Sequence, residues 1–514
     1  MRLTPTRKFP PPPPHVAIVG GGLAGLAAAA ALADRGVRIS LFESRPRLGG
    51  RASSFVDPVT GELVDNCQHV SMACCTNLAD FCRRVGTAGL FRRVGAIRFL
   101  GPEGTLSTLA AGPLPAPLHL AGSFLRANYL TRTERLRVAY GLARLWSRRG
   151  DRPGEPFARW LRRHGQTDRT IDRYWGTVLV SALNERLDRM DVDHARKVFL
   201  DGFLRHRDGY QMEIPTVPLG ELYGKRLERW LADHDVTVHL TTGVRSVEVD
   251  EDGHLAGLRL RDGEAVAADF VLLAAPFDRV ASFLAPALRD RLPALGRLDE
   301  IRSSPITGVH LWFDRPVCPF DHVVTVGRLI HWVFNHSAIQ GRTDGEGGGQ
   351  YLQVVISASD DLVPLAKAAI RDAVLADLAT IWPAAKDAVL TRWWVVTEHG
   401  ATFAVRPGVD ALRPPQRTPI EGLFLAGDWT ATGWPATMEG AIRSGYLAAE
   451  GVLADLGRPC EVIRPGLPAG LLARWLLGPG PDARPRTRYD ALVEPGEGER
   501  SSTSFSADPR IMNI

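Results

Sequence analysis

The sequence predicts an α/β fold whose parallel sheet is assembled from stretches far apart in the chain. A short apolar run, a glycine-rich turn and an alanine-rich helix follow one another over residues 15–36, and a second apolar strand ends at Glu43. Near the other end of the chain, the apolar run 423–426 is followed by Gly427, Asp428 and a further helix. Because 514 residues exceed one ordinary hydrophobic core, we expect two closely joined domains.

The first strand, residues 16–19, is followed by three glycines at G-x-G-x-x-G spacing: Gly20, Gly22 and Gly25. The first glycine permits a tight turn, the second lets the backbone approach a pyrophosphate, and the third lets the helix pack closely against the strand. The backbone N–H groups at the helix start, at Leu23 and Ala24, together with the positive end of the helix dipole, favour phosphate groups.

The second strand, residues 37–42, is followed directly by Glu43 and Ser44. A carboxylate about 20 residues after the glycines can accept a hydrogen bond from a ribose hydroxyl, and it would repel a 2′-phosphate. The ordered series of strand, glycines, helix, strand and acid predicts a dinucleotide-binding unit. The alternative is a glycine-rich turn in some other α/β unit.

The segment that follows distinguishes NAD from FAD. Gly49, Gly50 and Arg51 come soon after the acid, and they can bring more backbone and a guanidinium to the same diphosphate. This G-G-R run resembles the flavin amine oxidase and phytoene desaturase superfamily. The resemblance extends over about residues 15–458 and implies FAD as the cofactor.

Several segments resemble one family of this superfamily, the hydroxysqualene dehydroxylases. Residues 65–69, D-N-C-Q-H, are similar to the D-N-G-Q-H of that family, although Cys67 replaces the usual glycine. Residues 173–175 and 181–184 resemble its F-W-x-P-L and A-x-L-N segments, and residues 401–403 resemble its A-T-F segment.

The resemblance implies further FAD contacts. The backbone of Val244 would meet the adenine, and Asp428 after Gly427 would hold the ribityl or pyrophosphate portion. The helix that begins near Met438 would point its N-terminus at N1 and C2=O of the flavin, where negative charge builds on reduction. Since no cysteine lies in residues 422–444, we expect noncovalent FAD.

The expected architecture is a Rossmann-like FAD-binding domain of the glutathione reductase type, interleaved with an α+β substrate domain as in amine oxidases. In the FAD domain we expect a helix over residues 222–233 and a strand meander of residues 244–249, 258–261 and 270–275. The expected divisions are a flexible leader, 1–14; an FAD-binding domain, 15–89, 205–285 and 415–458; a substrate domain, 90–204 and 286–414; and a partly disordered tail, 459–514.

By this resemblance the leading function is reductive dehydroxylation of hydroxysqualene, a long isoprenoid, to squalene. The hydroxyl leaves as water after protonation, and hydride from reduced flavin quenches the allylic cation. The sequence ranks none of its candidate proton donors, which are Glu398, His399, His69 and Glu185. For His69 we favour a structural role beside the flavin over acid–base catalysis.

The aromatic residues of the predicted substrate domain fit an apolar pocket. Trp312, Trp332 and Phe334 lie on predicted strands and suit the floor of a hydrocarbon site, because aromatic faces stabilise a passing cation. A plain hydrophobic core explains them equally well.

Three other functions stay open. A carotenoid-type desaturase would carry hydride from substrate to flavin, and an amine oxidase would normally need a flavin-facing lysine and an aromatic cage. A flavin-bearing or lipid-binding protein without turnover would keep the same FAD contacts. The sequence does not identify the electron donor of the flavin.

Composition and residue spacing argue against nucleic acid and metal as partners and leave contact with a membrane open. The net charge of +5 rests on arginine without basic runs that interleave aromatic residues, so we expect no nucleic acid. The cysteines Cys67, Cys74, Cys75 and Cys82 lack zinc-site spacing, so we expect no metal. We expect a cytoplasmic protein. The basic faces of helices over residues 133–148 and 156–163 are either solvated or rest on the inner face of the membrane.

Overall fold

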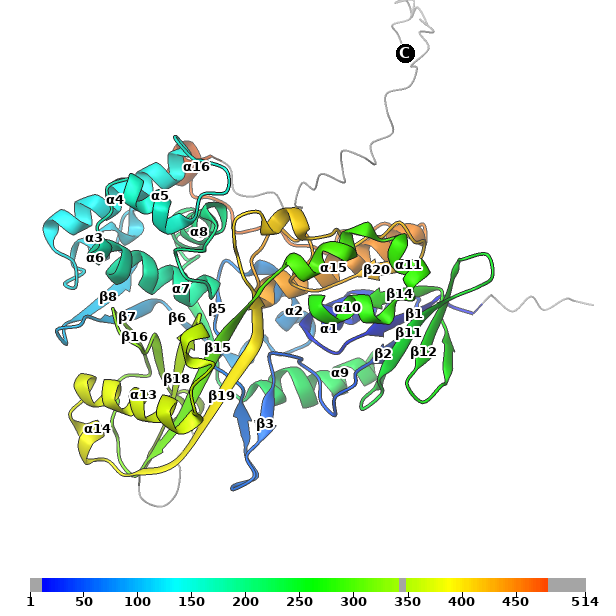
Figure 1. Ribbon diagram of the computed structural model, residues 1–514, viewed down its shortest axis with the longest axis horizontal. Coiled ribbons are helices and arrows are strands. Elements are labelled where there is room, and N and C mark those ends of the chain that lie inside the picture. The colour runs from blue at the N-terminus through cyan, green and yellow to red at the C-terminus, as the bar shows by residue number, and fades with distance from the viewer. Residues whose placement is uncertain (1–11, 342–347, 479–514) are drawn as a thin grey trace, which may run out of the picture.

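The computed structural model describes residues 12–341 and 348–478. The molecule is elongated, with a five-stranded sheet toward one end and a seven-stranded sheet toward the other (Figure 1). Most of the predicted leader and tail lies outside the described residues.

The five-stranded sheet is parallel and follows the order β10-β2-β1-β14-β20. Its central strand β1 pairs with β2 on one side and with β14 on the other, so the strand order reverses around β1. Ligands of such sheets bind where the order reverses, beyond the carboxyl ends of the strands. The sheet confirms the predicted α/β fold. Its strands are β1 (His15–Val19), β2 (Arg38–Phe42), β10 (Val236–His239), β14 (Phe270–Leu273) and β20 (Leu423–Leu425).

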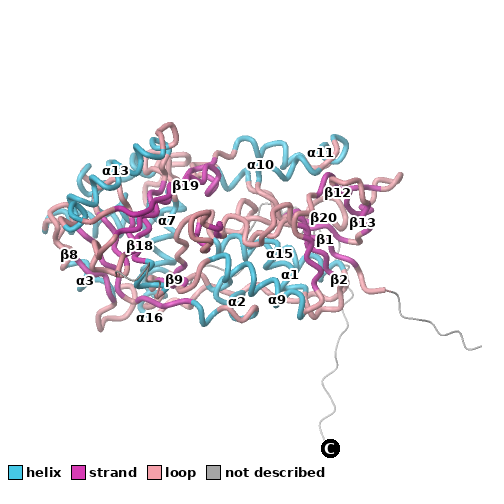
Figure 2. The backbone as a smooth tube through the Cα atoms, turned by 90° about the horizontal axis from the view of Figure 1, so that it is seen from below, coloured by secondary structure: helices cyan, strands magenta, loops and turns pink. Residues whose placement is uncertain are grey.

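Helices cover the parallel sheet, and α1 (Leu23–Leu32) is buried along its whole length. Its alanines leave room for α15 (Met438–Asp455), which packs across it, with α2 (Thr76–Arg84) and α9 (Arg226–Asp233) alongside (Figure 2). The predicted helix 222–233 is less regular than expected, because residues Glu221–Lys225 form a π-helical turn before α9.

The predicted meander is wrong in its third strand. The hairpin β11 (Val244–Val249) and β12 (Leu255–Leu260) is completed by β13 (Ala265–Ala267), whereas β14 joins the parallel sheet. All four residues of β14 are buried, and such a continuous apolar run is typical of a central parallel strand.

The seven-stranded sheet is mixed, in the order β19-β15-β18-β17-β16-β7-β8. One face packs on α13 (Lys367–Ile381) through Ile370, Val374 and Leu378, while the other face looks toward the parallel sheet. Its strands are β7 (Ala96–Leu100), β8 (Leu106–Ala110), β15 (Ser303–Phe313), β16 (His322–Thr325), β17 (Trp332–Asn335), β18 (Gln350–Ser357) and β19 (Leu390–Phe403).

A helical layer over residues 118–204 completes this end of the molecule. It contains α3 (Ala121–Leu125), α4 (Arg132–Ser147), α5 (Phe157–Arg163), α6 (Asp168–Thr170), α7 (Thr177–Leu183), α8 (Val192–Lys197) and a π-helical turn, Val198–Leu204. The remaining elements are short: β3 (Ser54–Val56), β4 (Leu63–Asp65), β5 (Ser71–Met72), β6 (Phe91–Val94), β9 (Met212–Pro215), α10 (Phe277–Val280), α11 (Pro286–Asp290), α12 (His336–Gln340), α14 (Ala384–Asp387) and α16 (Leu471–Leu477).

Buried histidines make the fold sensitive to acid. Burial lowers the pKa of His310 to about 3 and that of His331 to about 4, and burial with the charge of Arg207 lowers that of His119 to about 4. The Nδ1 atom of His331 accepts the N–H of Ser357 at 3.0 Å, so it has no room for a proton. Protonation of these histidines therefore favours the unfolded chain.

We therefore expect stability to fall with acidity in a defined window. The folded pKa values lie below the ordinary value of 6.5, so the contribution is complete above pH 6.5 and is lost as pH falls toward 4. Each histidine should cost on the order of 2 kcal/mol by pH 5. Urea unfolding at pH 7 and pH 5 measures this, and equal unfolding free energies at the two pH values would contradict it.

Candidate active site

A single large cavity extends from the carboxyl ends of the parallel strands to the inner face of the mixed sheet. Its volume is about 1120 Å³. Pockets for one drug-sized ligand measure roughly 300–1,000 Å³, so this cavity has room for a dinucleotide and part of a second molecule. The predicted FAD-binding residues other than Gly25 line it.

The glycine turn after β1 brings backbone to the cavity wall. Gly20 has φ +113°, and a Cβ there would lie 2.6 Å from the carbonyl oxygen of Ala274. Gly25 lies behind the wall, where a side chain would clash with the carbonyl oxygen of Gly20. The helix α1 starts after Gly22 with no side-chain cap, so its first N–H groups, at Leu23 and Ala24, are free for phosphate oxygens.

Glu43 holds the turn in shape. One of its carboxylate oxygens accepts the N–H of Gly21 at 2.8 Å, and the other accepts the N–H of Arg45 at 2.8 Å. The carboxylate is buried and also lines the cavity next to Ser44. Glu43 is therefore placed to order the loop and to meet a ribose.

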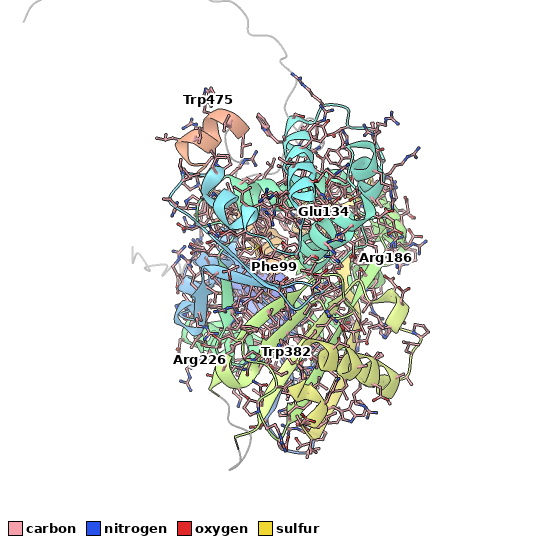
Figure 3. All side chains as sticks on the ribbon, turned by 90° about the vertical axis from the view of Figure 1, so that its left-hand side faces the viewer. Phe99, Glu134, Arg186, Arg226, Trp382 and Trp475 are labelled. Carbon is pink, nitrogen blue, oxygen red and sulfur yellow. The ribbon has the colours of Figure 1, made fainter. Side chains whose placement is uncertain are left out.

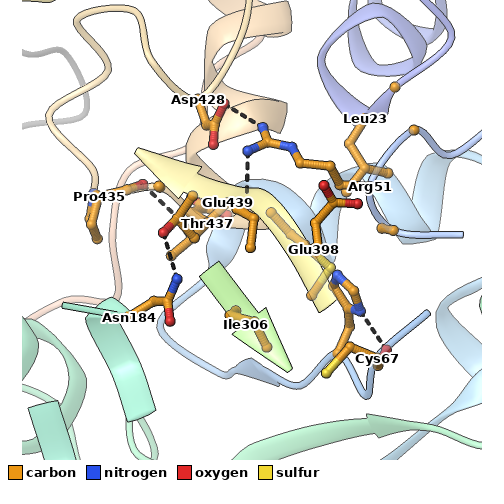
Figure 4. A pocket seen from close by; sticks show the side chains of 18 of the residues that line it. Leu23, Arg51, Cys67, Asn184, Ile306, Glu398, Asp428, Pro435, Thr437 and Glu439 are labelled. Carbon is orange, nitrogen blue, oxygen red and sulfur yellow. Dashed lines mark hydrogen bonds and ion pairs between the residues drawn. The ribbon is translucent and has the colours of Figure 1, made fainter. Parts of the chain in front are cut away.

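An ion pair between Arg51 and Asp428 joins the two ends of the chain (Figure 4). The guanidinium lies 2.6 Å from the carboxylate and donates a second hydrogen bond to the carbonyl oxygen of Ala401 at 2.9 Å. Burial works to lower the pKa of Arg51, but the charges of Asp428 and Glu398 outweigh it and raise that pKa. The pair links the G-G-R turn, strand β19 and the loop after β20.

Arg413, which the sequence interpretation missed, braces the loop that carries Asp428. Its buried guanidinium donates to the carbonyl oxygens of Asp428 at 3.0 Å, Thr430 at 3.0 Å and Trp434 at 2.7 Å. It also pairs with Asp410 at 2.7 Å. No local pattern around Arg413 indicates this role, because its acceptors are carbonyl groups whose position depends on the fold.

The start of α15 forms the far wall. Thr437 caps the helix by accepting the N–H of Gly440 at 3.1 Å, and Met438 follows at the cavity surface. Glu439 is buried, and burial raises its pKa although its carboxylate accepts the N–H groups of Asn77 and Leu78. These bonds fix α15 to α2.

Of the four candidate proton donors, His69 and Glu398 line the cavity and the other two do not. His399 is exposed on β19 outside the cavity. Glu185 is fully buried in ion pairs with Arg189 at 2.8 Å and Arg406 at 3.1 Å. The prediction of a proton-donor role for these two residues finds no support, because neither reaches the cavity.

The half of the cavity next to the mixed sheet is largely apolar. Trp332 and Phe334 are stacked 5.3 Å apart on β17, and Ile97, Phe99, Val178 and Phe203 join them in the wall. Trp312 does not line the cavity and follows the alternative of a plain hydrophobic core: it lies further along the same face of β15 as cavity-lining Ile306 and packs on Tyr351, 4.3 Å away, and on Val64.

The sequence interpretation also missed a charged pair in this wall. Lys197 lies 2.8 Å from Asp201, and its ammonium sits 4.6 Å from the centre of the Trp434 ring. Both charged residues line the cavity. Their spacing of four residues on helical chain was the available signal.

Cysteines are another part of the wall. Cys67, Cys74 and Cys75 line the cavity as free thiols, and burial raises the pKa of Cys67 to about 12. Over the described ranges, one group could share a cation, namely Asp250, Asp252 and His254. All three are exposed at the turn between β11 and β12, and none lines the cavity.

No helix within residues 12–341 and 348–478 combines the length and apolar character needed to cross a bilayer.

The fold and the cavity define a dinucleotide-binding protein with an apolar second chamber. Residues 23–453 match the family described as flavin containing amine oxidoreductase, and the chain belongs to that family. It is therefore an FAD-dependent oxidoreductase.

Individual proteins of this superfamily are similar to the chain in sequence or in structure. The chain is 27% identical over 452 residues to 15-cis-phytoene desaturase of Solanum lycopersicum, covering 84% of this chain and 76% of the relative. It is 27% identical over 468 residues to the probable zeta-carotene desaturase of Synechococcus elongatus, covering 84% and 97%. A solved oxidoreductase from Methanosarcina mazei shares the fold, with a TM-score of 0.65, 17% identity, and coverage of 86% of this chain and 100% of that one.

The residues present fit FAD. The glycine turn leaves open backbone at Gly22, where the nearest atom to an added Cβ would be 4.0 Å away, and Arg51 offers a positive charge nearby. Gln68, in the D-N-C-Q-H segment, also lines the cavity. Its buried Oε1 has no hydrogen-bond partner among the described residues. A polar ring with N–H groups would satisfy that oxygen.

Proposed function

We propose that this chain is an FAD-dependent desaturase of a long isoprenoid hydrocarbon, with noncovalent FAD held by the glycine turn, Glu43, Arg51, Asp428 and the start of α15. The observation that carries the proposal is His69 on the wall of a largely apolar cavity, with its Nδ1 bonded to the carbonyl oxygen of Cys67. The similarity to phytoene and zeta-carotene desaturases supports the same reaction class. Those relatives favour desaturation over the dehydroxylation that the sequence had placed first.

His69 is set up to accept a proton. Its Nδ1 lies 2.8 Å from the carbonyl oxygen of Cys67, an acceptor, so Nδ1 carries the hydrogen and Nε2 keeps its lone pair. Burial, and then the charge of Arg51, lowers the pKa of His69. At neutral pH the ring is therefore a base rather than an acid.

Desaturation removes a hydride and a proton from adjacent carbons of a C–C single bond. Bound FAD supplies the hydride acceptor. In our proposal Nε2 of His69 takes the proton, the C–H electron pair left behind becomes the new π bond, and the apolar wall around Trp332 and Phe334 excludes water. Arg51 and Asp428 hold the loops around the cofactor.

A second candidate is reductive dehydroxylation of hydroxysqualene, favoured by residues 65–69 and their D-N-C-Q-H pattern. That reaction needs a proton donor for the leaving hydroxyl. Glu398 is the candidate, because it lines the cavity beside Arg51 (Figure 4). Here His69 would act only through its hydrogen bond to Cys67.

Anaerobic single-turnover experiments test both reactions. Oxidised enzyme mixed with phytoene should lose its flavin absorbance as a desaturated product appears by mass spectrometry. Reduced enzyme mixed with hydroxysqualene should regain absorbance and form squalene only if the second candidate is right. If both mixtures leave flavin and lipid unchanged, both proposals fail.

His69→Gln should separate the two reactions further. We expect it to keep its flavin but to desaturate about 10²–10⁴-fold more slowly, because the base is lost. The exposed His399→Gln is the matched control and should behave as wild type. In wild type, activity should persist as pH falls below 6.5, since the pKa of His69 is lowered. Full activity of His69→Gln would remove His69 from the mechanism.

A further inference from the structure

An exposed apolar patch lies over α16 and the segment 112–126. Large apolar side chains are seldom left this open to water without a partner. Its members and their exposed fractions are Leu114 (48%), Leu118 (46%), Leu125 (62%), Leu471 (90%) and Trp475 (81%).

The two parts of the patch are in contact. The N–H of Gly470 donates to the carbonyl oxygen of Arg205 at 2.9 Å, and a Cβ at Gly470 would lie 3.6 Å from that of Ala116. The side chain of Arg207 donates to the carbonyl oxygen of Leu114 at 3.0 Å. Residues 205–207 therefore connect α16 to the segment 112–126.

The outward face of α16 is apolar although it faces water. Ala473 is completely buried and anchors the helix, whereas Leu471 and Trp475 are four residues apart and share the outer face. Figure 3 shows Trp475 at the outer edge of the molecule. A helix that is apolar on its exposed side requires another surface to cover it.

The two segments that carry the patch hold positive charge only. Residues 105–133 and 462–478 contain no aspartate or glutamate. Arg126, Arg207 and Arg474 are exposed there, whereas Arg464 is paired with Asp80 at 2.8 Å. Tryptophan and leucine beside arginine are the residues of helices that lie in the headgroup region of anionic membranes.

We propose that this patch docks the protein on an anionic lipid bilayer, with Leu471 and Trp475 entering the boundary between headgroups and acyl chains. The basic surroundings favour this occupant over a second copy of the chain, since two copies would bring these arginines together. The surface differs from the basic faces of α4 and α5, for which the sequence left both solvation and membrane contact open.

The docking surface is linked to the cavity wall. Asp201 and Phe203, in the π-helical turn after α8, line the cavity, and Arg205 two residues further accepts the hydrogen bond from Gly470. A hydrocarbon dissolved in the bilayer would then meet the enzyme beside its cavity. This last link rests on the proposed function, whereas the docking itself does not.

Vesicle flotation of the full-length holoprotein tests the docking without any substrate. Wild type should float with phosphatidylcholine vesicles that contain phosphatidylglycerol, and less with phosphatidylcholine alone. The double variant Leu471→Ser/Trp475→Ser should lose at least about tenfold in partitioning. Arg474→Gln should lose about fivefold, and high salt should weaken wild-type binding.

Val59→Ser is the matched control, because Val59 is 73% exposed on the turn between β3 and β4 and should leave binding unchanged. Three results would overturn the proposal: wild type that floats with neither vesicle, a double variant that binds as wild type does, or a dimer in solution that the double variant dissociates. Leu136 is an exposed residue of α4. If Leu136→Ser lost vesicle binding while the double variant bound fully, the membrane contact would lie on α4 instead. If the protein bound vesicles but did not desaturate any lipid, the proposed function would fail and the docking proposal would stand.

Discussion

Gly445→Ala is expected to lower the unfolding free energy by about 2–3 kcal/mol and to reduce flavin content. Gly445 lies in α15 where that helix crosses α1. A Cβ there would clash with the carbonyl oxygen of Ala24 and lie 2.9 Å from the Cβ of Ala27. The nearest obstacle is backbone, so α1 must move, and its N-terminus is the predicted phosphate site.

The sign of the change in unfolding free energy shows whether helix packing or helix propensity dominates at position 445. Intrinsic helix propensity alone would make alanine more stable than glycine by about 1 kcal/mol. Chemical denaturation and the flavin absorbance per protein measure the outcome, with Gly296→Ala as control, because Gly296 is exposed with nothing within 4 Å of an added Cβ. A Gly445→Ala variant as stable as wild type and fully loaded with flavin would show that α1 and α15 are not closely packed.

The comparison between Gly25 and Gly445 shows what sequence could predict. Gly25 belongs to a turn whose shape is determined by neighbouring residues, so its need for a small side chain is visible in the local pattern. Gly445 touches α1 only after the chain has folded, and nothing beside it in the sequence indicates that contact. The same holds for β14, which local turn signals had placed in the wrong sheet.

The catalytic end of the cavity was less predictable than the nucleotide end. The D-N-C-Q-H pattern drew attention to His69, but the role as a base that we propose for it depends on the carbonyl oxygen of Cys67 and on the burial of the ring. The spacing of Lys197 and Asp201 fits a helical pair, but no sequence pattern indicated the π-helical turn that carries Asp201 to the cavity. Trp312 lies on the same face of β15 as cavity-lining Ile306, but six residues further along, where Val64 and Tyr351 cover it.

Arg413 could not be predicted from local sequence either, because it is a buried charge whose partners are brought to it only by the fold. Its guanidinium satisfies three carbonyl oxygens, the hydroxyl of Thr432 at 3.0 Å and the carboxylate of Asp410, and it lies 4.9 Å from the centre of the Phe403 ring. Removing a buried charge from such a network leaves several acceptors without donors. The loop of residues 428–434 should then lose the shape that presents Asp428 to Arg51.

We expect Arg413→Met to lose its FAD and to be about 3–5 kcal/mol less stable than wild type, measured by flavin absorbance after gel filtration and by urea unfolding. Arg413→Lys should recover only part of the FAD content and part of the stability, since an ammonium cannot reproduce the planar array of donors of a guanidinium. The control is Arg417→Met, where a 53% exposed side chain pairs with Asp455 at the surface and the loss should stay below about 1 kcal/mol. If Arg413→Met retained FAD while losing stability, Arg413 would support the fold without positioning Asp428. Loss of FAD beyond what Arg417→Met shows, with partial rescue by lysine, would identify Arg413 as the residue that positions Asp428, the aspartate predicted to bind the flavin.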